Sequence, residues 1–99
     1  MGKYDKGFEL IQELVKKRWI PEIVHSVSLG NHTYTDILNS IEYISHTELI
    51  RKLKILEEYD CVEKTEKGNN VYYYLKPLGY DLDHIFSHFV ELGDKYFTV

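Results

Sequence analysis

The sequence lacks several features that would mark a membrane protein, a secreted protein or an enzyme. No apolar run approaches the roughly 20 residues that span a bilayer, and Met1 to Asp5 lack the apolar stretch of a secretory signal. Cys61 is the only cysteine, which excludes a disulfide or a multi-cysteine zinc site within one chain. Gly-rich phosphate loops, nucleophile motifs and the His-Glu pairs of zinc proteases are also missing. We therefore expect a cytoplasmic protein without catalytic activity, metal, other cofactor or membrane partner.

Positive charge is scarce overall but unevenly placed. The chain has 12 basic and 16 acidic residues and a net charge of -4, which disfavours DNA as a partner because phosphates are neutralised by Lys and Arg. Residues 46–54, however, hold three basic residues and one acidic residue, whereas residues 79–99 hold four acidic residues and one basic residue. A basic middle and an acidic tail suit a protein that presents one face to DNA and another to itself.

The chain has the size of one domain. Its 99 residues are 43% hydrophobic and 28% charged, which is ordinary for a globular protein, and no repeat, linker or low-complexity segment divides them. So short a chain buries a modest fraction of its surface. We therefore expect a single domain over residues 1–99 that covers further apolar area by forming a homodimer.

The first part of the chain has the apolar spacing of two helices. Apolar residues recur at helical spacing over residues 6–17, which predicts a first helix. A second pattern opens at Trp19 and has Pro21 in its first turn, where the missing N–H costs nothing. This second helix is predicted to stop near Gly30.

Two more helices with clear start signals follow. A brief extended piece is expected around residues 32–34, and Thr35 and Asp36 are predicted to cap a short helix. Ser45 and Glu48 match the capping box, in which each side chain satisfies a backbone N–H of the other residue. A helix over residues 45–58 is therefore predicted, with one stripe facing the core. That stripe is Leu49, Leu53 and Leu56.

The last third of the sequence predicts a hairpin and a long helix. Residues 62–65 and 71–75 are rich in β-formers and are separated by Gly68-Asn69-Asn70. A broad apolar stripe then predicts a helix that ends near Tyr96. Helix, helix, short strand, helix, helix, hairpin and helix is the order of a winged helix-turn-helix. The expected fold is therefore mainly α with a small β-hairpin, an α+β arrangement.

In such a fold the helix over residues 45–58 is the recognition helix, and the hairpin over residues 62–75 is the wing. The positions predicted to face outward are Thr47, Glu48, Arg51, Lys54 and Ile55. The base-reading candidates are His46, Thr47 and Arg51, because Arg pairs bidentately with guanine and the other two reach base edges or phosphates. Lys52 and Lys54 should contact phosphates. Further candidate DNA contacts are Tyr34, Thr35, Ser45 and Lys67.

Some features of the sequence suggest functions other than binding double-stranded DNA. His84 and His88 stand one helical turn apart, a spacing that binds a transition metal when other ligands join, but such a pair is more often a polar helix flank. Tyr72 to Tyr74 could stack on single strands, but alternate tyrosines of a hairpin face the core. The serious alternative is a winged helix module for protein-protein interaction, which the acidic net charge and the short wing favour. The basic residues of the recognition helix favour double-stranded DNA.

The chain resembles the HxlR-type family of winged helix regulators, over about residues 8–97. The residues that carry the resemblance are Lys17-Arg18-Trp19, Tyr34-Thr35-Asp36-Ile37, Ile44-Ser45, Leu49, Arg51-Lys52-Leu53-Lys54, Leu56-Glu57, Val62-Glu63-Lys64-Thr65, Val71-Tyr72-Tyr73, Leu75, Pro77, Leu78 and Gly79. The resemblance implies a DNA-binding transcriptional regulator that forms a homodimer through its first and last helices. The expected interface residues are Phe8, Ile11, Leu82, Ile85, Phe86 and Phe89.

This sequence departs from the family pattern in four places. The family often has a cysteine near the N-terminus that serves redox sensing, and this chain has none there, so thiol sensing is not carried over. The usual Asp-Gly-Leu after the recognition helix reads Asp60-Cys61-Val62, which makes Cys61 a packing residue. The wing is shorter and lacks the usual proline, and Lys76 replaces the Thr that normally caps the last helix.

Overall fold

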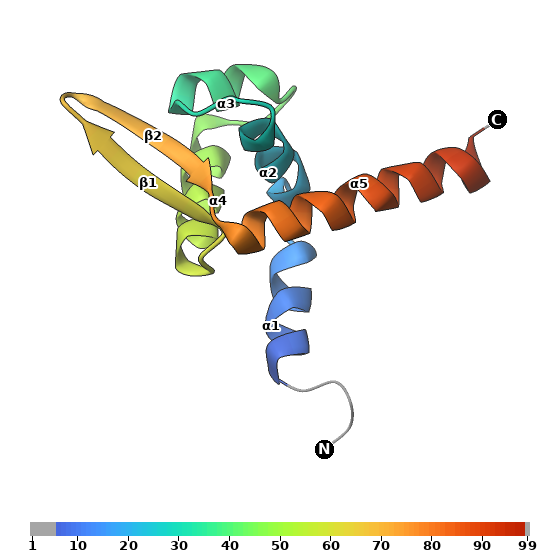
Figure 1. Ribbon diagram of the computed structural model, residues 1–99. Helices are drawn as coiled ribbons and strands as arrows, with labels where there is room; N and C mark the ends of the chain where they lie inside the picture. The colour runs from blue at the N-terminus through green and yellow to red at the C-terminus, as the bar shows by residue number, and fades with distance from the viewer. Residues whose placement is uncertain (1–5, 99) are drawn as a thin grey trace.

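The computed structural model describes residues 6–98 (Figure 1). Its elements are α1 (Lys6–Val15), α2 (Ile20–Ser28), α3 (Tyr34–Ser40), α4 (His46–Glu58), β1 (Val62–Lys67), β2 (Asn70–Leu75) and α5 (Pro77–Phe97). The two strands form one antiparallel sheet. This mainly helical fold with a small hairpin confirms the predicted fold class, and α1 and α2 end within a few residues of their predicted ends.

One cluster of apolar side chains joins α2, α4, the hairpin and the first half of α5. The predicted stripe of α4 is fully included, because Leu49, Leu53 and Leu56 are all buried. Burying one such leucine stabilises the fold by roughly 1.5 to 3 kcal/mol. The inward side of the recognition helix is thereby fixed, and its opposite side remains free for other contacts. The other fully buried apolar side chains are Leu14, Ile20, Ile23, Val24, Val27, Ile37, Cys61 and Leu82.

Both helices of the α3–α4 pair begin with a side-chain cap. The cap of α3 is Thr33, whose Oγ1 accepts the Asp36 N–H at 3.0 Å, so the predicted cap at Thr35 is wrong by two residues. Thr35 lies inside the first turn of α3, where it does not have the extended conformation of a cap. At α4, Ser45 Oγ accepts the Glu48 N–H at 3.1 Å, which confirms the predicted start of that helix.

The short strand predicted around residues 32–34 does not form. A single residue there pairs with the hairpin: Tyr73 N–H donates to the His32 carbonyl at 2.7 Å, and His32 Nδ1 lies 2.9 Å from the Tyr73 carbonyl oxygen. Because Thr33 already serves as the cap of α3, the extended piece is too short for a ladder. The two contacts between His32 and Tyr73 still tie the segment before α3 to β2.

The wing is a tight hairpin in which Lys67 pairs with Asn70. Gly68 has a φ of 62°, whereas the φ of Asn69 is not positive. This is the pattern of a type II′ turn, in which glycine is favoured at the first central position. Tyr73 is buried on the core side of β2, as predicted for alternate tyrosines. Tyr72 lies on the other side, where it is half-buried and its ring centroid is 6.5 Å from that of Tyr74.

The wing leads into α5 through a close backbone contact. Lys76 N–H donates to the Cys61 carbonyl at 2.9 Å, and the Lys76 ammonium lies 2.9 Å from the Asp60 carboxylate. The hydrogen bond from the Lys76 ammonium to Asp60, followed by the charge of Asp60, raises the pKa of Lys76. Asp60 itself has a φ of 62° after the end of α4, a position that glycine commonly takes. The start of α5 is therefore held against the end of α4.

Two helical arms extend from the core. Figure 1 shows α1 and the C-terminal half of α5 leaving the body in different directions, with the α5 end pointing away from the hairpin. The radius of gyration is 14.6 Å, against about 13 Å for a compact chain of this length. None of the helices within residues 6–98 combines the length and apolar character that crossing a membrane requires.

Candidate nucleic-acid interface

The outward face of α4 carries a continuous exposed row at positions 47, 50, 51 and 54. This spacing of three and four residues places Thr47, Ile50, Arg51 and Lys54 along one side of the helix, opposite its buried leucines. Ile55 was predicted to lie on this face, but it is half-buried and packs against the core. Ile50, which is 59% exposed, takes its place. An exposed isoleucine in such a row can contact the methyl group of thymine.

Lys52 does not lie on this face. Its side chain is buried to 8% exposure, and its ammonium lies 3.5 Å from the Glu48 carboxylate. The expected phosphate contact of Lys52 is therefore incorrect: the long side chain covers apolar surface beside the core and its charge is paired within the helix. Glu48 also lies 3.5 Å from the Arg51 guanidinium. The Arg51 side chain remains 65% exposed, so its pairing with Glu48 is a weak surface contact that a stronger anion can replace.

The first turn of α4 is fixed to the first turn of α3 through two aromatic side chains. The Tyr34 hydroxyl lies 3.0 Å from His46 Nδ1 and donates to the His46 carbonyl at 3.1 Å. The two rings stack with centroids 5.7 Å apart. Tyr34 is half-buried and its hydroxyl is engaged by His46. The phosphate contact expected at Tyr34 and Thr35, through the free N–H groups at the start of α3, stays a prediction. His46 and Ser45 are exposed at the start of the recognition helix, and Thr35 is exposed on α3.

The wing places Lys67 at its tip. Lys67 is exposed directly before the turn residue Gly68. Lys64 is exposed further down β1, but Glu63 and Glu66 are exposed on the same strand. The wing therefore offers a cation at its end and little net charge along its length.

A second group of exposed residues, which we call the apolar arm face, consists of apolar side chains on α5 and α1. Its most exposed members on α5 are Ile85, Phe89, Val90, Leu92, Tyr96 and Phe97, and on α1 they are Phe8 and Leu10. Leu82 and Phe86, expected at a dimer interface, are instead buried in the protomer core and support this face from beneath. Ile11 is half-buried. Ile85, Phe89 and Phe8 are exposed, and their place in a dimer interface stays a prediction. Val90, Leu92, Tyr96, Phe97 and Leu10 are exposed as well but were not predicted as interface residues.

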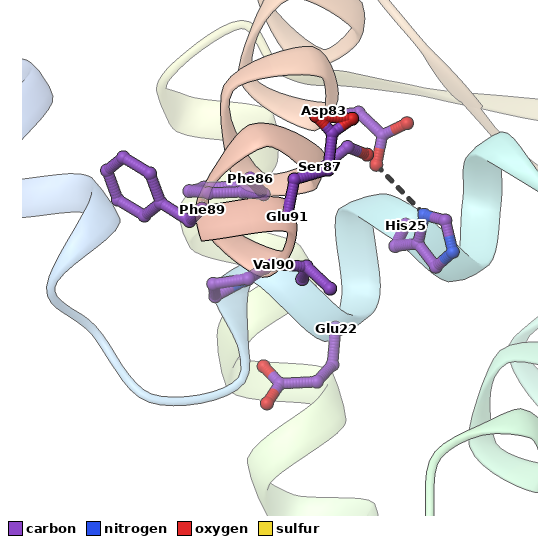
Figure 2. Close-up of a pocket in the computed structure, with 9 residues that line it drawn as sticks. Glu22, His25, Asp83, Phe86, Ser87, Phe89, Val90 and Glu91 are labelled. Atoms are coloured by element: carbon purple, nitrogen blue, oxygen red, sulfur yellow. Dashed lines mark hydrogen bonds and ion pairs between the residues drawn. The ribbon is translucent and has the colours of Figure 1, made fainter. Parts of the chain in front are cut away.

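A groove of about 500 Å³ runs between α2 and α5 at the edge of the apolar arm face (Figure 2). Phe89 and Val90 line it together with the carboxylates of Glu22 and Glu91. At one end, His25 Nδ1 lies 3.1 Å from the Asp83 carboxylate, and this contact joins the two helices. Within residues 6–98, no group of three or more His, Cys, Asp or Glu side chains could hold a metal ion.

Cys61 lies away from both surfaces. It is fully buried, and burial, followed by the charge of Asp60, raises the pKa of its thiol to about 11. At neutral pH the group is a protonated thiol and hence a poor nucleophile. Cys61 therefore packs in the core, as the sequence analysis expected.

Known proteins resemble this chain both in sequence pattern and in fold. The family described as HxlR-like helix-turn-helix matches residues 14–99. The reduced form of the transcriptional regulator YodB from B. subtilis superposes with a TM-score of 0.81 at 27% identity, over 94% of each chain. The diamide-treated form of YodB gives a TM-score of 0.79 at 26% identity, over 99% of this chain and 100% of that one.

A third structure agrees in fold alone. A possible HxlR family transcriptional factor from Thermoplasma volcanium GSS1 has a TM-score of 0.70 at 24% identity, over 96% of this chain and 87% of that chain. No curated protein sequence matches the chain. The family and these structural neighbours are regulators of transcription with a helix-turn-helix, not enzymes.

Proposed function

The chain belongs to the HxlR-like helix-turn-helix family, and from that premise we propose that it is a homodimeric, sequence-specific DNA-binding regulator of transcription. In this proposal residues 1–99 act as one DNA-binding domain. The recognition helix, α4 with its cap, enters the major groove, and the wing lies beside it on the backbone. A protein that binds the chromosome works in the compartment that holds it, which we take to be the cytoplasm.

The exposed row on α4 is the observation that carries the proposal. It presents Thr47, Ile50, Arg51 and Lys54 on the one side of the helix that the core leaves free. These side chains provide a hydroxyl, an apolar group and two cations, which together can contact base edges, a thymine methyl group and phosphates. Lys67, exposed at the wing tip, would add a further cation for a backbone phosphate.

The apolar arm face supports a dimer. The six α5 side chains of the apolar arm face are each at least 38% exposed, and the C-terminal half of that helix extends from the core. A surface of this kind on a small domain indicates an interaction site, because monomers rarely expose contiguous apolar area. Since the α5 end and the hairpin point in opposite directions (Figure 1), two-fold pairing through α5 and α1 leaves both recognition helices free. A dimer would then bind two half-sites about one helical turn of DNA apart.

Selection from a pool of random duplex DNA at two salt concentrations tests the proposal. We expect the purified protein to enrich a two-fold symmetric motif and to bind it more weakly at higher salt. Enrichment of a motif without symmetry would contradict the dimer. The absence of both enrichment and salt-sensitive binding at micromolar protein would contradict DNA binding itself.

Two substitutions on α4 should separate base reading from phosphate contact. Arg51→Ala is expected to relax sequence preference at one base pair and to weaken binding to the selected motif by roughly 1 to 3 kcal/mol. Lys54→Ala is expected to weaken binding to all duplexes alike and to reduce the salt slope by about 1. Titrations of the selected motif and of an unrelated duplex at several salt concentrations measure both effects. Identical behaviour of the two variants on all duplexes would contradict these roles.

Glu48→Gln should change DNA affinity and stability in opposite directions. The Glu48 carboxylate lies beside Arg51 and would repel phosphates. Removing this repulsion, about 1 kcal/mol, should make the variant bind DNA about fivefold more tightly. It should also lower the free energy of unfolding by about 1 kcal/mol, because buried Lys52 loses its counter-charge. Glu58→Gln, an exposed position on the same helix, is the matched control for the change in charge. Equal effects of the two substitutions would show that the Glu48 pairs are unimportant.

A winged helix module for protein-protein interaction is the second candidate function. The net charge of -4 and the acidic residues exposed on the wing favour it. Such a module would keep the apolar arm face and have no salt-sensitive affinity for duplex DNA. The selection described above distinguishes the two functions.

A further inference from the structure

Tyr34 and His46 begin the two helices of the helix-turn-helix, and each is held by its surroundings. Each directly follows an N-cap residue, Thr33 or Ser45, whose side chain accepts a backbone N–H of its own helix. The Tyr34 ring also packs against the hydrophobic core. The two rings stack at an interplanar angle of 26°. Tyr34 is therefore a fixed support against which the exposed His46 ring rests.

The hydrogen bonds between the two residues determine where the imidazole proton lies. The Tyr34 oxygen is 3.1 Å from the His46 carbonyl oxygen and 3.0 Å from His46 Nδ1. A carbonyl oxygen only accepts, so this contact is a hydrogen bond only when the single hydroxyl hydrogen of Tyr34 is donated to it. The contact with Nδ1 is then a hydrogen bond only if Nδ1 carries a hydrogen and donates it to the Tyr34 oxygen. In a neutral imidazole this leaves Nε2 as an acceptor, and Nε2 has no hydrogen-bond partner within residues 6–98.

We infer that Tyr34 is a positioning residue that holds His46 as the Nδ1–H tautomer, and that His46 Nε2 selects a base, adenine or cytosine, whose exocyclic amino group it meets in the major groove. This inference rests on the proposed function, because it assigns a base-reading chemistry to the first residue of the recognition helix. In the major groove, adenine N6 and cytosine N4 are amino donors, whereas guanine O6 and N7 and thymine O4 are acceptors. An acceptor at Nε2 pairs with the first group and is unpaired opposite the second.

The inference gives His46 and Arg51 opposite preferences. The Arg51 guanidinium only donates and pairs best with guanine. His46, one turn earlier on α4, would only accept at Nε2 and pair with adenine or cytosine. The recognition helix would then distinguish two neighbouring positions of a half-site by hydrogen-bond polarity.

The tautomer is measured on the protein without DNA. Long-range 1H–15N correlation spectra of histidine-labelled protein at alkaline pH report which ring nitrogen is protonated, and His46→Ala assigns the signal. We expect a protonated Nδ1 in the unchanged protein and a shift toward the Nε2–H form in Tyr34→Phe, which keeps the stacked ring but lacks the hydroxyl. A His46 signal with protonated Nε2 in the unchanged protein would overturn the inference.

The base preference is measured on DNA. Selection with His46→Ala identifies the base pair at which preference is lost, and the amino group of that base is then removed by placing purine for adenine or pyrimidin-2-one for cytosine. We expect a loss of affinity of about 3- to 10-fold for the unchanged protein. His46→Ala should show little loss, which accounts for any weakening of the base pair itself. Tyr34→Phe should bind unrelated duplex normally but lose most of the discrimination.

The outcomes separate this inference from the proposed function. The inference would be overturned, with the proposed function intact, by either of two results on an enriched symmetric motif. One is an equal loss of affinity in the unchanged protein and in His46→Ala when the amino group is removed. The other is a preference of His46 for guanine or thymine. If no duplex is enriched, the proposed function fails and the base preference fails with it. The spectrum of the free protein then still decides whether Tyr34 sets the tautomer.

Discussion

Phe89→Glu is expected to convert the dimer to a monomer and to abolish tight binding to a symmetric DNA site. Phe89 is 61% exposed at the middle of the apolar arm face and lines the groove between α2 and α5. In a two-fold interface each residue occurs twice. A charge buried in both copies should cost at least about 2 kcal/mol per copy, which weakens the dimer by a factor of roughly 1,000. Glu91 and Asp83 nearby would add repulsion.

Loss of the dimer should reduce affinity for the full site by about 100-fold or more, because each half-site then binds alone. Light scattering after size exclusion gives the mass, and titration with the selected duplex gives the affinity. Tyr80→Glu is the matched control. Tyr80 is also 61% exposed on α5, but it lies nine residues away, which is half a turn out of phase on a helix of 3.6 residues per turn. A dimer that persists in Phe89→Glu, or that Tyr80→Glu disrupts equally, would place the interface elsewhere.

The elements of this fold are largely predictable because each has a local signal. Ser45 starts the recognition helix through a cap that depends on residues three apart, and the leucines behind it recur at helical spacing. Gly68 supplies the positive φ that closes the wing. The strand expected near His32 does not form, because too few residues are left to pair once Thr33 caps α3. The sequence of this segment has strand character, so its local pattern did not indicate this outcome.

The candidate site is less predictable because a helical wheel gives direction but not burial. Lys52 looks like a phosphate contact from its charge, yet its side chain lies over the core and pairs with Glu48. Ile50 was not predicted on the outward face, where Ile55 was placed instead, although positions 47, 50, 51 and 54 form one row. The Tyr34–His46 contact joins residues 12 apart and has no signal in the sequence. Contacts between elements therefore require the structure.

The apolar arm face shows the same limit at a larger scale. A stripe along α5 was predicted, but its buried half, Leu82 and Phe86, could not be separated from its exposed half by periodicity alone. The division depends on how far α2 covers α5, and the start of α2, at Pro21 and Glu22, lies beside Phe89 and Val90. Beyond that point the stripe continues without cover, and this is why its exposed members cluster toward Phe97.

Gly79→Ala is expected to destabilise the protein by about 2 kcal/mol, although alanine favours helices. A Cβ at Gly79 would overlap the carbonyl oxygen of Cys61 and lie 3.0 Å from Cδ2 of Leu75. The Cys61 carbonyl cannot move aside freely, because it accepts the Lys76 N–H at 2.9 Å. Overpacking of this kind costs about 1 to 3 kcal/mol or more, against a gain in helix propensity of about 1 kcal/mol.

Gly93→Ala on the same helix is the control for this substitution. A Cβ at Gly93 meets nothing within 4 Å, so the variant should gain up to about 1 kcal/mol from helix propensity. Urea unfolding at one fixed protein concentration measures both variants, with an unchanged m-value as the condition for comparing midpoints. Because Gly79 sets how closely α5 leaves the wing, Gly79→Ala should also weaken binding to the symmetric duplex by displacing one recognition helix relative to the other. Equal stability of the two variants would show that α5 does not begin in this close contact with Cys61.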